Sequence, residues 1–231
     1  MDARRSPLPL GWYTPGGHPD FWGDGGTYEL IPYEYLPPLD VSLLDGSFAW
    51  LNQSPLSYAD GLELCDPSPT PQDSLGRLAA EADRNGLSLP DAFVPFMTNP
   101  EIHGRVPSCT ACCLSLSDRL IDISGRARGR LVRFMNDQQC VLLWYLYLEE
   151  GHAPAVAVGA PQFDDEEPGE SLDDVVQLTD LYFCAPTFEE FILRFWLENT
   201  IWYALQQRRP LALEQSQYLD AVRRVRHRLQ G

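Results

Sequence analysis

Three cysteines near the middle of the chain are the side chains whose types and spacing could most readily do chemistry. Cys109-Thr-Ala-Cys112-Cys113 contains the C-x-x-C spacing of zinc sites and redox centres, and His103 lies six residues before it. Partial alternation of apolar residues predicts a strand over 109–116, in which Cys109 and Cys112 point to opposite faces and Cys109 and Cys113 lie about 13 Å apart. No second C-x-x-C is present. We therefore expect small buried thiols, with no metal and no cofactor.

Other catalytic patterns are absent from the sequence. The four histidines have no sequence context that pairs one of them with a thiol as its base. All seventeen basic residues are arginines, which excludes Schiff-base and P-loop lysine chemistry, and no GxGxxG, Walker, GxSxG or HExxH motif occurs. We expect no enzyme. The alternative is a metal- or thiol-dependent enzyme that uses residues 103–113.

The charge of the chain is strongly negative and is concentrated in one segment. Seventeen basic residues against thirty-three acidic ones give a formal net charge of −16. No basic residue occurs from residue 134 to residue 193, where thirteen acidic residues lie. Such a field repels nucleic acid, so we expect no nucleic-acid partner, and it raises the association rate of a basic protein. For the acidic loop at 162–174 taken alone, the alternative is a solvated segment that only aids solubility.

Composition divides the chain near residue 72. Residues 1–72 are rich in Gly, Pro and aromatic residues, which predicts an irregular extension of turns and short strands whose rings pack on the rest of the protein. Residues 73–231 are expected to form the main domain. The N-terminus lacks the apolar run of a signal peptide, and the most apolar segment, 188–205, carries four charged residues, so we expect a cytoplasmic protein with no membrane partner. Most of the six cysteines should then be free.

Hydrophobic periodicity predicts an α+β fold with a mainly antiparallel sheet flanked by helices. The clearest strands are 129–135 and 140–148, and the second is apolar on both faces, which places it in the middle of the sheet. Residues 155–158 predict a further short strand. A long helix is expected to begin after Thr187 as its N-cap, with Glu190 three residues later.

The remaining helices and the aromatic residues complete this expectation. Further helices are expected at 75–85, 89–97 and 211–229. Five aromatic residues of the central strand and the long helix are expected to form core, with a binding groove as the alternative. These residues are Trp144, Tyr145, Tyr147, Trp196 and Trp202.

Several short motifs follow one another in an order typical of one protein family. A short helix led by Leu89-Pro90 comes first, and then Leu131-Val-Arg-Phe134, the turn with Asp137-Gln138, Trp144-Tyr-Leu-Tyr-Leu148 and the helix at Ala185-Pro-Thr-Phe-Glu-Glu-Phe191. Over residues 87–207 the chain resembles the SMI1/KNR4 (SUKH) superfamily. The resemblance implies helices around an antiparallel sheet, no catalytic activity and, as in many bacterial members, an immunity protein that binds and neutralises a cognate toxin.

The charge pattern and the resemblance together predict a partner-binding face. Nuclease toxins carry basic clefts for phosphate, so a dense acidic face could occupy such a cleft. A scaffold protein with several partners is a further alternative with the same fold. The residues expected to contact a basic partner, the suspected cognate toxin, are Glu149, Glu150, Asp164, Asp165, Glu166, Glu167, Asp173 and Asp174.

Overall fold

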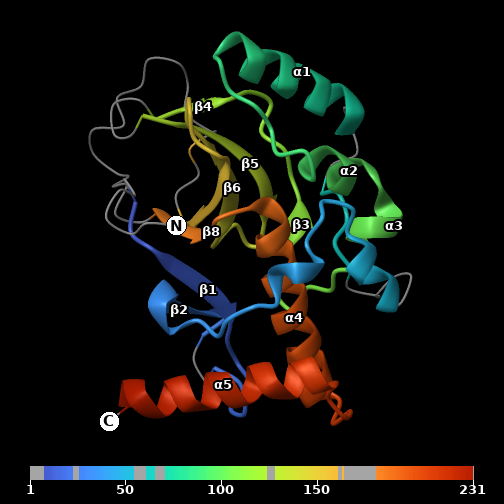
Figure 1. Cartoon of the computed structure of the whole chain (residues 1–231), viewed down its shortest axis with the longest axis vertical. Helices are drawn as coiled ribbons and strands as arrows, with labels where there is room; N and C mark the ends of the chain where they lie inside the picture. Colours follow the sequence, from blue (N-terminus) through green and yellow to red (C-terminus); the bar gives the residue numbers. More distant parts are fainter. Residues whose placement is uncertain are drawn as a thin grey trace.

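The computed structural model has an α+β fold in which helices flank antiparallel sheets, as the sequence predicted (Figure 1). The structure describes residues 8–22, 26–54, 61–65, 71–123, 128–160, 163 and 181–230. The larger sheet has the order β3-β5-β6-β7-β8, β4 also pairs with β5, and each pairing is antiparallel. Its strands are β3 (Cys113–Leu114), β4 (Ile121–Asp122), β5 (Arg130–Asn136), β6 (Leu143–Leu148), β7 (Ala155–Gly159) and β8 (Leu181–Ala185).

Helices cover one face of this sheet (Figure 1). The helix α4 passes from the sheet to α5, which lies at the far end of the molecule. Residues of α1, α2 and α4 share one cluster of buried side chains with the sheet, so this face holds the main core. The helices are α1 (Pro71–Arg84), α2 (Phe93–Thr98), α3 (Pro100–His103), α4 (Phe188–Gln206) and α5 (Leu213–Gln230).

The central strand β6 is buried on both faces, which confirms its predicted place in the middle of the sheet. Trp144 and Leu146 lie in the main core beneath the helices. Tyr145 and Tyr147 point to the opposite face, where the ring of Tyr147 meets that of Phe183 edge-on at 5.0 Å. A strand that is apolar on both sides stays in the sheet only if both sides are covered, and here both are.

The long helix α4 begins where the sequence predicted. The hydroxyl of Thr187 accepts a hydrogen bond from the backbone N–H of Glu190 at 3.1 Å, which satisfies one of the free donors of the first turn. The first residue, Phe188, is 1% exposed and meets the rings of Phe93, Phe96 and Phe134 at 5.0–5.3 Å. The start of α4 therefore anchors the helix in an aromatic core.

The N-terminal segment is built from short elements that pack on the body. β1 (Gly11–Pro15) and β2 (Tyr28–Pro32) form a two-stranded antiparallel sheet, and an isolated parallel bridge from Leu10 to Phe183 joins this segment to the strand β8. Three 3-10 helices follow: η1 (Tyr33–Tyr35), η2 (Val41–Leu43) and η3 (Ala49–Gln53). Short strands and packed rings are what the Gly, Pro and aromatic composition predicts.

Some boundaries differ from the sequence prediction, each for a local reason. The predicted strand at 109–116 is confined to β3, because residues 109–110 form a turn in which the Ser108 hydroxyl accepts a bond from the N–H of Cys112 at 2.9 Å. The helix expected from Leu89 begins only at Phe93, because residues 91–92 form a turn and Leu89 precedes Pro90, a place that disfavours helical backbone. The short strands β4 and β8 are not in the sequence prediction.

We predict that the substitution Phe188→Ala lowers the free energy of unfolding by about 3–5 kcal/mol, because it leaves a cavity among four aromatic rings. Urea denaturation followed by circular dichroism measures the change. Val141→Ala is the matched control, since Val141 is 49% exposed and its truncation should change stability by less than roughly 0.5 kcal/mol. Equal effects of the two substitutions would contradict the packing described for Phe188.

Candidate functional site

Of the eight acidic residues predicted to bind a partner, the structure places two. Glu149 and Glu150 lie together in the turn after β6, whereas Asp164, Asp165, Glu166, Glu167, Asp173 and Asp174 lie outside the described residues. The Glu149 carboxylate accepts a hydrogen bond from the Tyr147 hydroxyl at 2.9 Å and lies 3.9 Å from Nδ1 of His152. Burial, followed by that hydrogen bond and the carboxylate charge, raises the pKa of Tyr147.

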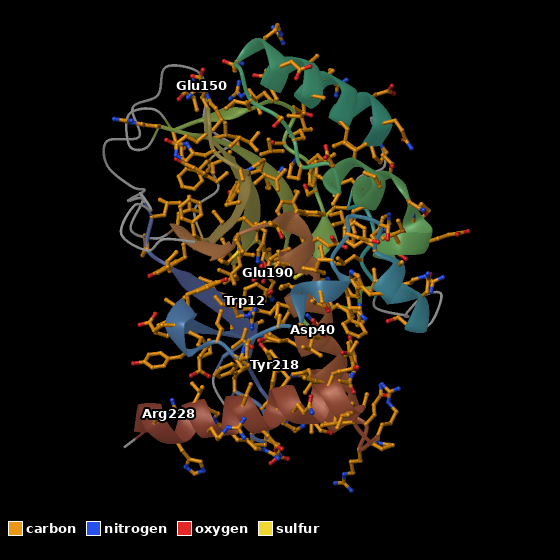
Figure 2. All side chains as sticks on the ribbon, viewed as in Figure 1. Trp12, Asp40, Glu150, Glu190, Tyr218 and Arg228 are labelled. Carbon is orange, nitrogen blue, oxygen red and sulfur yellow. A yellow bond between two sulfur atoms is a disulfide. The ribbon has the colours of Figure 1, made fainter. Side chains whose placement is uncertain are left out.

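Glu150 is the exposed member of the pair. It lies at the end of the molecule that also carries α1 (Figure 2). The carboxylate of Glu150 lies near Gly86, the residue with φ of 67° just past α1. A Cβ atom built on Gly86 would be 3.8 Å from Oε1 of Glu150. This end of the sheet therefore presents at least one free carboxylate to solvent, beside a partly buried one.

Two other acidic residues of the segment without basic residues serve the interior. Asp137 is 2% exposed and accepts a bond from the N–H of Val141 at 2.7 Å, which closes the turn between β5 and β6. Glu189 is 6% exposed and accepts bonds from the N–H of Gly46 at 2.7 Å and from Nε1 of Trp50 at 3.1 Å. Both add to the sequence charge without extending an exposed acidic face.

The thiols of Cys109 and Cys112 lie in a turn in which Cys112 is buried and Cys109 is half-buried. Burial raises the pKa of Cys109 and of Cys112, and the thiol of Cys112 lies 3.6 Å from the hydroxyl of Tyr28. His103 contacts the carbonyl oxygen of Leu62 through Nδ1 at 2.8 Å, and burial lowers its pKa. Within the described ranges, no group of three His, Cys, Asp or Glu side chains could hold a metal ion.

A buried ionic network, which sequence reasoning missed, connects α4 to both ends of the chain. The Glu198 carboxylate is fully buried and accepts bonds from Nε1 of Trp12 at 2.8 Å and from the hydroxyl of Tyr218 at 2.6 Å. Arg194 donates to that same hydroxyl at 2.9 Å and to the carbonyl of Pro37 at 3.0 Å. The available signal was the i, i+4 spacing of Arg194 and Glu198 in an apolar helix. Figure 2 shows Trp12 and Tyr218 close together between β1 and α5.

A pocket of about 360 Å³ opens beside this network, between η2, α4 and α5. Its walls are mainly apolar, and the rings of Trp50 and Trp196 meet there edge-on at 5.5 Å. Exposed polar side chains at Asp40, Glu214 and Arg224 carry both signs of charge. Such a pocket can accept an apolar group, and Trp196, expected in the core, lies at its wall.

Comparison with known proteins adds no relative. No protein-family model, no curated protein and no solved structure matches the chain. In the part of the chain that the structure describes, no helix has the length and apolar character needed to cross a membrane.

The raised pKa of Glu198 predicts how stability changes with pH. Burial raises this pKa above its ordinary value of 4.5, so the folded protein holds the proton more tightly than the unfolded chain. The free energy of unfolding of the wild type should therefore fall, relative to that of Glu198→Gln, as pH rises from 4.5 toward the raised pKa. Urea denaturation at a series of pH values measures this difference.

Glu150→Gln is the control for loss of one negative charge, because it changes an exposed carboxyl of the same type. A free energy of unfolding of the wild type that stays constant or rises with pH, relative to that of Glu198→Gln, would contradict the linkage.

The pocket predicts binding of an apolar dye. The fluorescent dye ANS should bind with a severalfold gain in fluorescence, because it brings an apolar ring system to aromatic walls. Leu43→Arg should abolish the gain, since Leu43 lines the pocket. Val41→Arg is the matched control, because Val41 is on the same 3-10 helix, is similarly exposed and does not line the pocket. Equal dye binding by both variants would contradict this site.

Proposed function

We propose that this chain is a non-catalytic protein-binding module of the SMI1/KNR4 type, an immunity protein that neutralises a basic cognate toxin in the cytoplasm. The observation that carries the proposal is the uneven distribution of charge along the sequence. Residues 134–193 contain no basic residue, whereas α5 ends with Arg223, Arg224, Arg226 and Arg228. Figure 2 shows Glu150 and Arg228 at opposite ends of the molecule.

Charge separation of this kind favours one orientation of a basic partner. The end with Glu149 and Glu150 attracts positive charge, and the arginine-rich end with α5 repels it. Complementary fields raise the rate of association and disfavour wrong orientations more than they add affinity. A toxin with a basic cleft would meet the acidic end first, and the acidic residues there would occupy the place of phosphate groups.

The pKa values of two thiols and the hydrogen bonds of the buried polar side chains support a protein that binds without catalysis. Cys109 and Cys112 are thiols whose raised pKa disfavours the nucleophilic thiolate, and His103 is engaged with a backbone carbonyl. The buried carboxylates of Glu189 and Glu198 each accept bonds from groups that hold the fold together. These contacts weigh against the alternative of an enzyme that uses residues 103–113.

Affinity capture from an extract of the source cells tests the proposal. The immobilised wild type should retain one basic protein at near-stoichiometric yield, and the yield should fall at high salt. Reversal of Asp164, Asp165, Glu166 and Glu167 to arginine should weaken the affinity for that protein roughly tenfold or more at low ionic strength. Titration calorimetry with the purified partner measures this change.

A variant with the same change of net charge is the control. It carries Glu34→Arg, Asp91→Arg, Glu101→Arg and Glu214→Arg, at exposed positions outside the acidic segment. This variant should keep most of the affinity. Equal losses in both variants would show a general charge effect and contradict a specific face, and a diffuse, salt-insensitive set of captured proteins would favour a scaffold protein instead.

A further inference from the structure

Three sulfur atoms converge on one buried amide side chain at the end of β5. Nδ2 of Asn136 lies 3.9 Å from Sγ of Cys113 and 3.6 Å from Sγ of Cys140. Oδ1 of the same side chain lies 3.7 Å from Sγ of Cys65. Cys65 and Cys113 form a disulfide, whereas Cys140 is a free thiol. Because the Sγ atoms of Cys113 and Cys140 both lie near Nδ2 of Asn136, the distance between these two sulfur atoms cannot exceed the sum of their distances to Nδ2.

The fold holds this amide in place. Asn136 is 8% exposed, and its Nδ2 donates to the carbonyl of Asp137 at 3.0 Å. In the pairing of β3 with β5, Asn136 lies directly opposite Cys113, so their side chains stand on the same face of the sheet. The position of the disulfide relative to Asn136 is thus set by the register of two paired strands.

The turn between β5 and β6 brings Cys140 back toward the same point. The N–H of Cys140 donates to the carbonyl of Asp137 at 3.0 Å, and Cys140 has a positive φ of 53°. Non-glycine residues rarely adopt this backbone region, and here the turn hydrogen bonds hold the residue in it. Cys140 is exposed, so its thiol is open to solvent while its sulfur contacts Asn136.

We propose that Cys113 is shared between two alternative disulfides and that Cys140 is the thiol that exchanges with the Cys65–Cys113 bond. The thiolate of Cys140, having lost its proton to solvent, attacks Sγ of Cys113. A Cys113–Cys140 bond forms as the Cys65–Cys113 bond breaks, and the electron pair leaves on the sulfur of Cys65, which takes a proton from solvent. The exchange needs no external oxidant or reductant.

The exchange would change what ties residues 61–65 to the sheet. In the structure the disulfide anchors this segment to β3, together with bonds from the N–H of Cys65 to the carbonyl of Leu114 at 2.9 Å and from the N–H of Leu114 to the carbonyl of Glu63 at 2.7 Å. After exchange, the covalent link joins β3 to the β5–β6 turn, and hydrogen bonds alone hold Cys65. Cys65 is itself exposed, so its leaving thiolate is solvated.

The disulfide corrects one expectation from the sequence, that the cysteines of 109–113 are all small buried thiols, because Cys113 is bonded to Cys65. The expectation that most of the six cysteines are free is confirmed, since four of them are. In a reducing compartment such a bond is typically transient and serves catalysis or redox sensing. A bond with an exchanging thiol beside it is of the labile kind.

Disulfide mapping of the full chain tests the proposal. The protein is purified without reductant, incubated at pH about 8 to form thiolate, quenched with acid, labelled with N-ethylmaleimide and digested for mass spectrometry. The wild type should contain both linkages and labelled Cys65, whereas Cys140→Ser should contain the Cys65–Cys113 linkage alone. Cys65→Ser, after oxidised glutathione is added, should form the Cys113–Cys140 linkage. Cys109→Ser is the matched control and should behave as wild type.

Two results would overturn the proposal. The first is a wild type that keeps only the Cys65–Cys113 bond, with Cys140 fully labelled at all times. The second is a Cys65–Cys140 linkage, which would assign the shared position to another sulfur. Circular dichroism of each variant establishes that it folds, and the wild-type measurement stands even where a variant does not. Neither result depends on the partner or on the acidic face.

Discussion

A fully buried carboxylate, that of Glu198, constrains how the parts of this protein meet. A charged group removed from water is tolerated when its oxygens are hydrogen-bonded and an opposite charge lies nearby. Trp12 on β1 and Tyr218 on α5 supply the two hydrogen bonds, and Arg194, one turn earlier on α4, donates to the same Tyr218 hydroxyl. Because these partners come from the beginning, the centre and the end of the fold, β1 and α5 cannot move away from α4 without leaving a buried polar group unpaired.

The first turn of α4 also holds other parts of the fold together. It contains Glu189, which ties the segment at Gly46 and Trp50 to the body, and its start at Phe188 lies in the aromatic core. The Glu189 carboxylate is thus engaged in holding elements together. Among the described residues, the surface presents the exposed carboxylate of Glu150, an apolar pocket and the exposed residue Cys140.

Local signals in the sequence predicted the elements that depend only on neighbouring residues. The N-cap at Thr187 needs one hydroxyl beside a free N–H, and the place of β6 follows from six apolar residues in a row. Local signals fail at residues 109–112, where alternation of apolar residues predicts a strand. A turn forms there instead, because the N–H of Cys112 donates to the hydroxyl of Ser108 and the N–H of Cys109 donates to the side-chain oxygen of Asn199, ninety residues away.

The sequence by itself determined the fold class, the central strand, the long helix and the location of the negative charge, because periodicity, capping and composition are local properties. Only the tertiary structure decided which charged groups lie inside and which sulfur atoms meet. Arg194, Glu189 and Glu198 are buried because long-range partners satisfy them, which no local pattern encodes. Likewise Cys65, Cys113 and Cys140 gather at Asn136 because strand register and one turn bring them there, although the chain separates them widely.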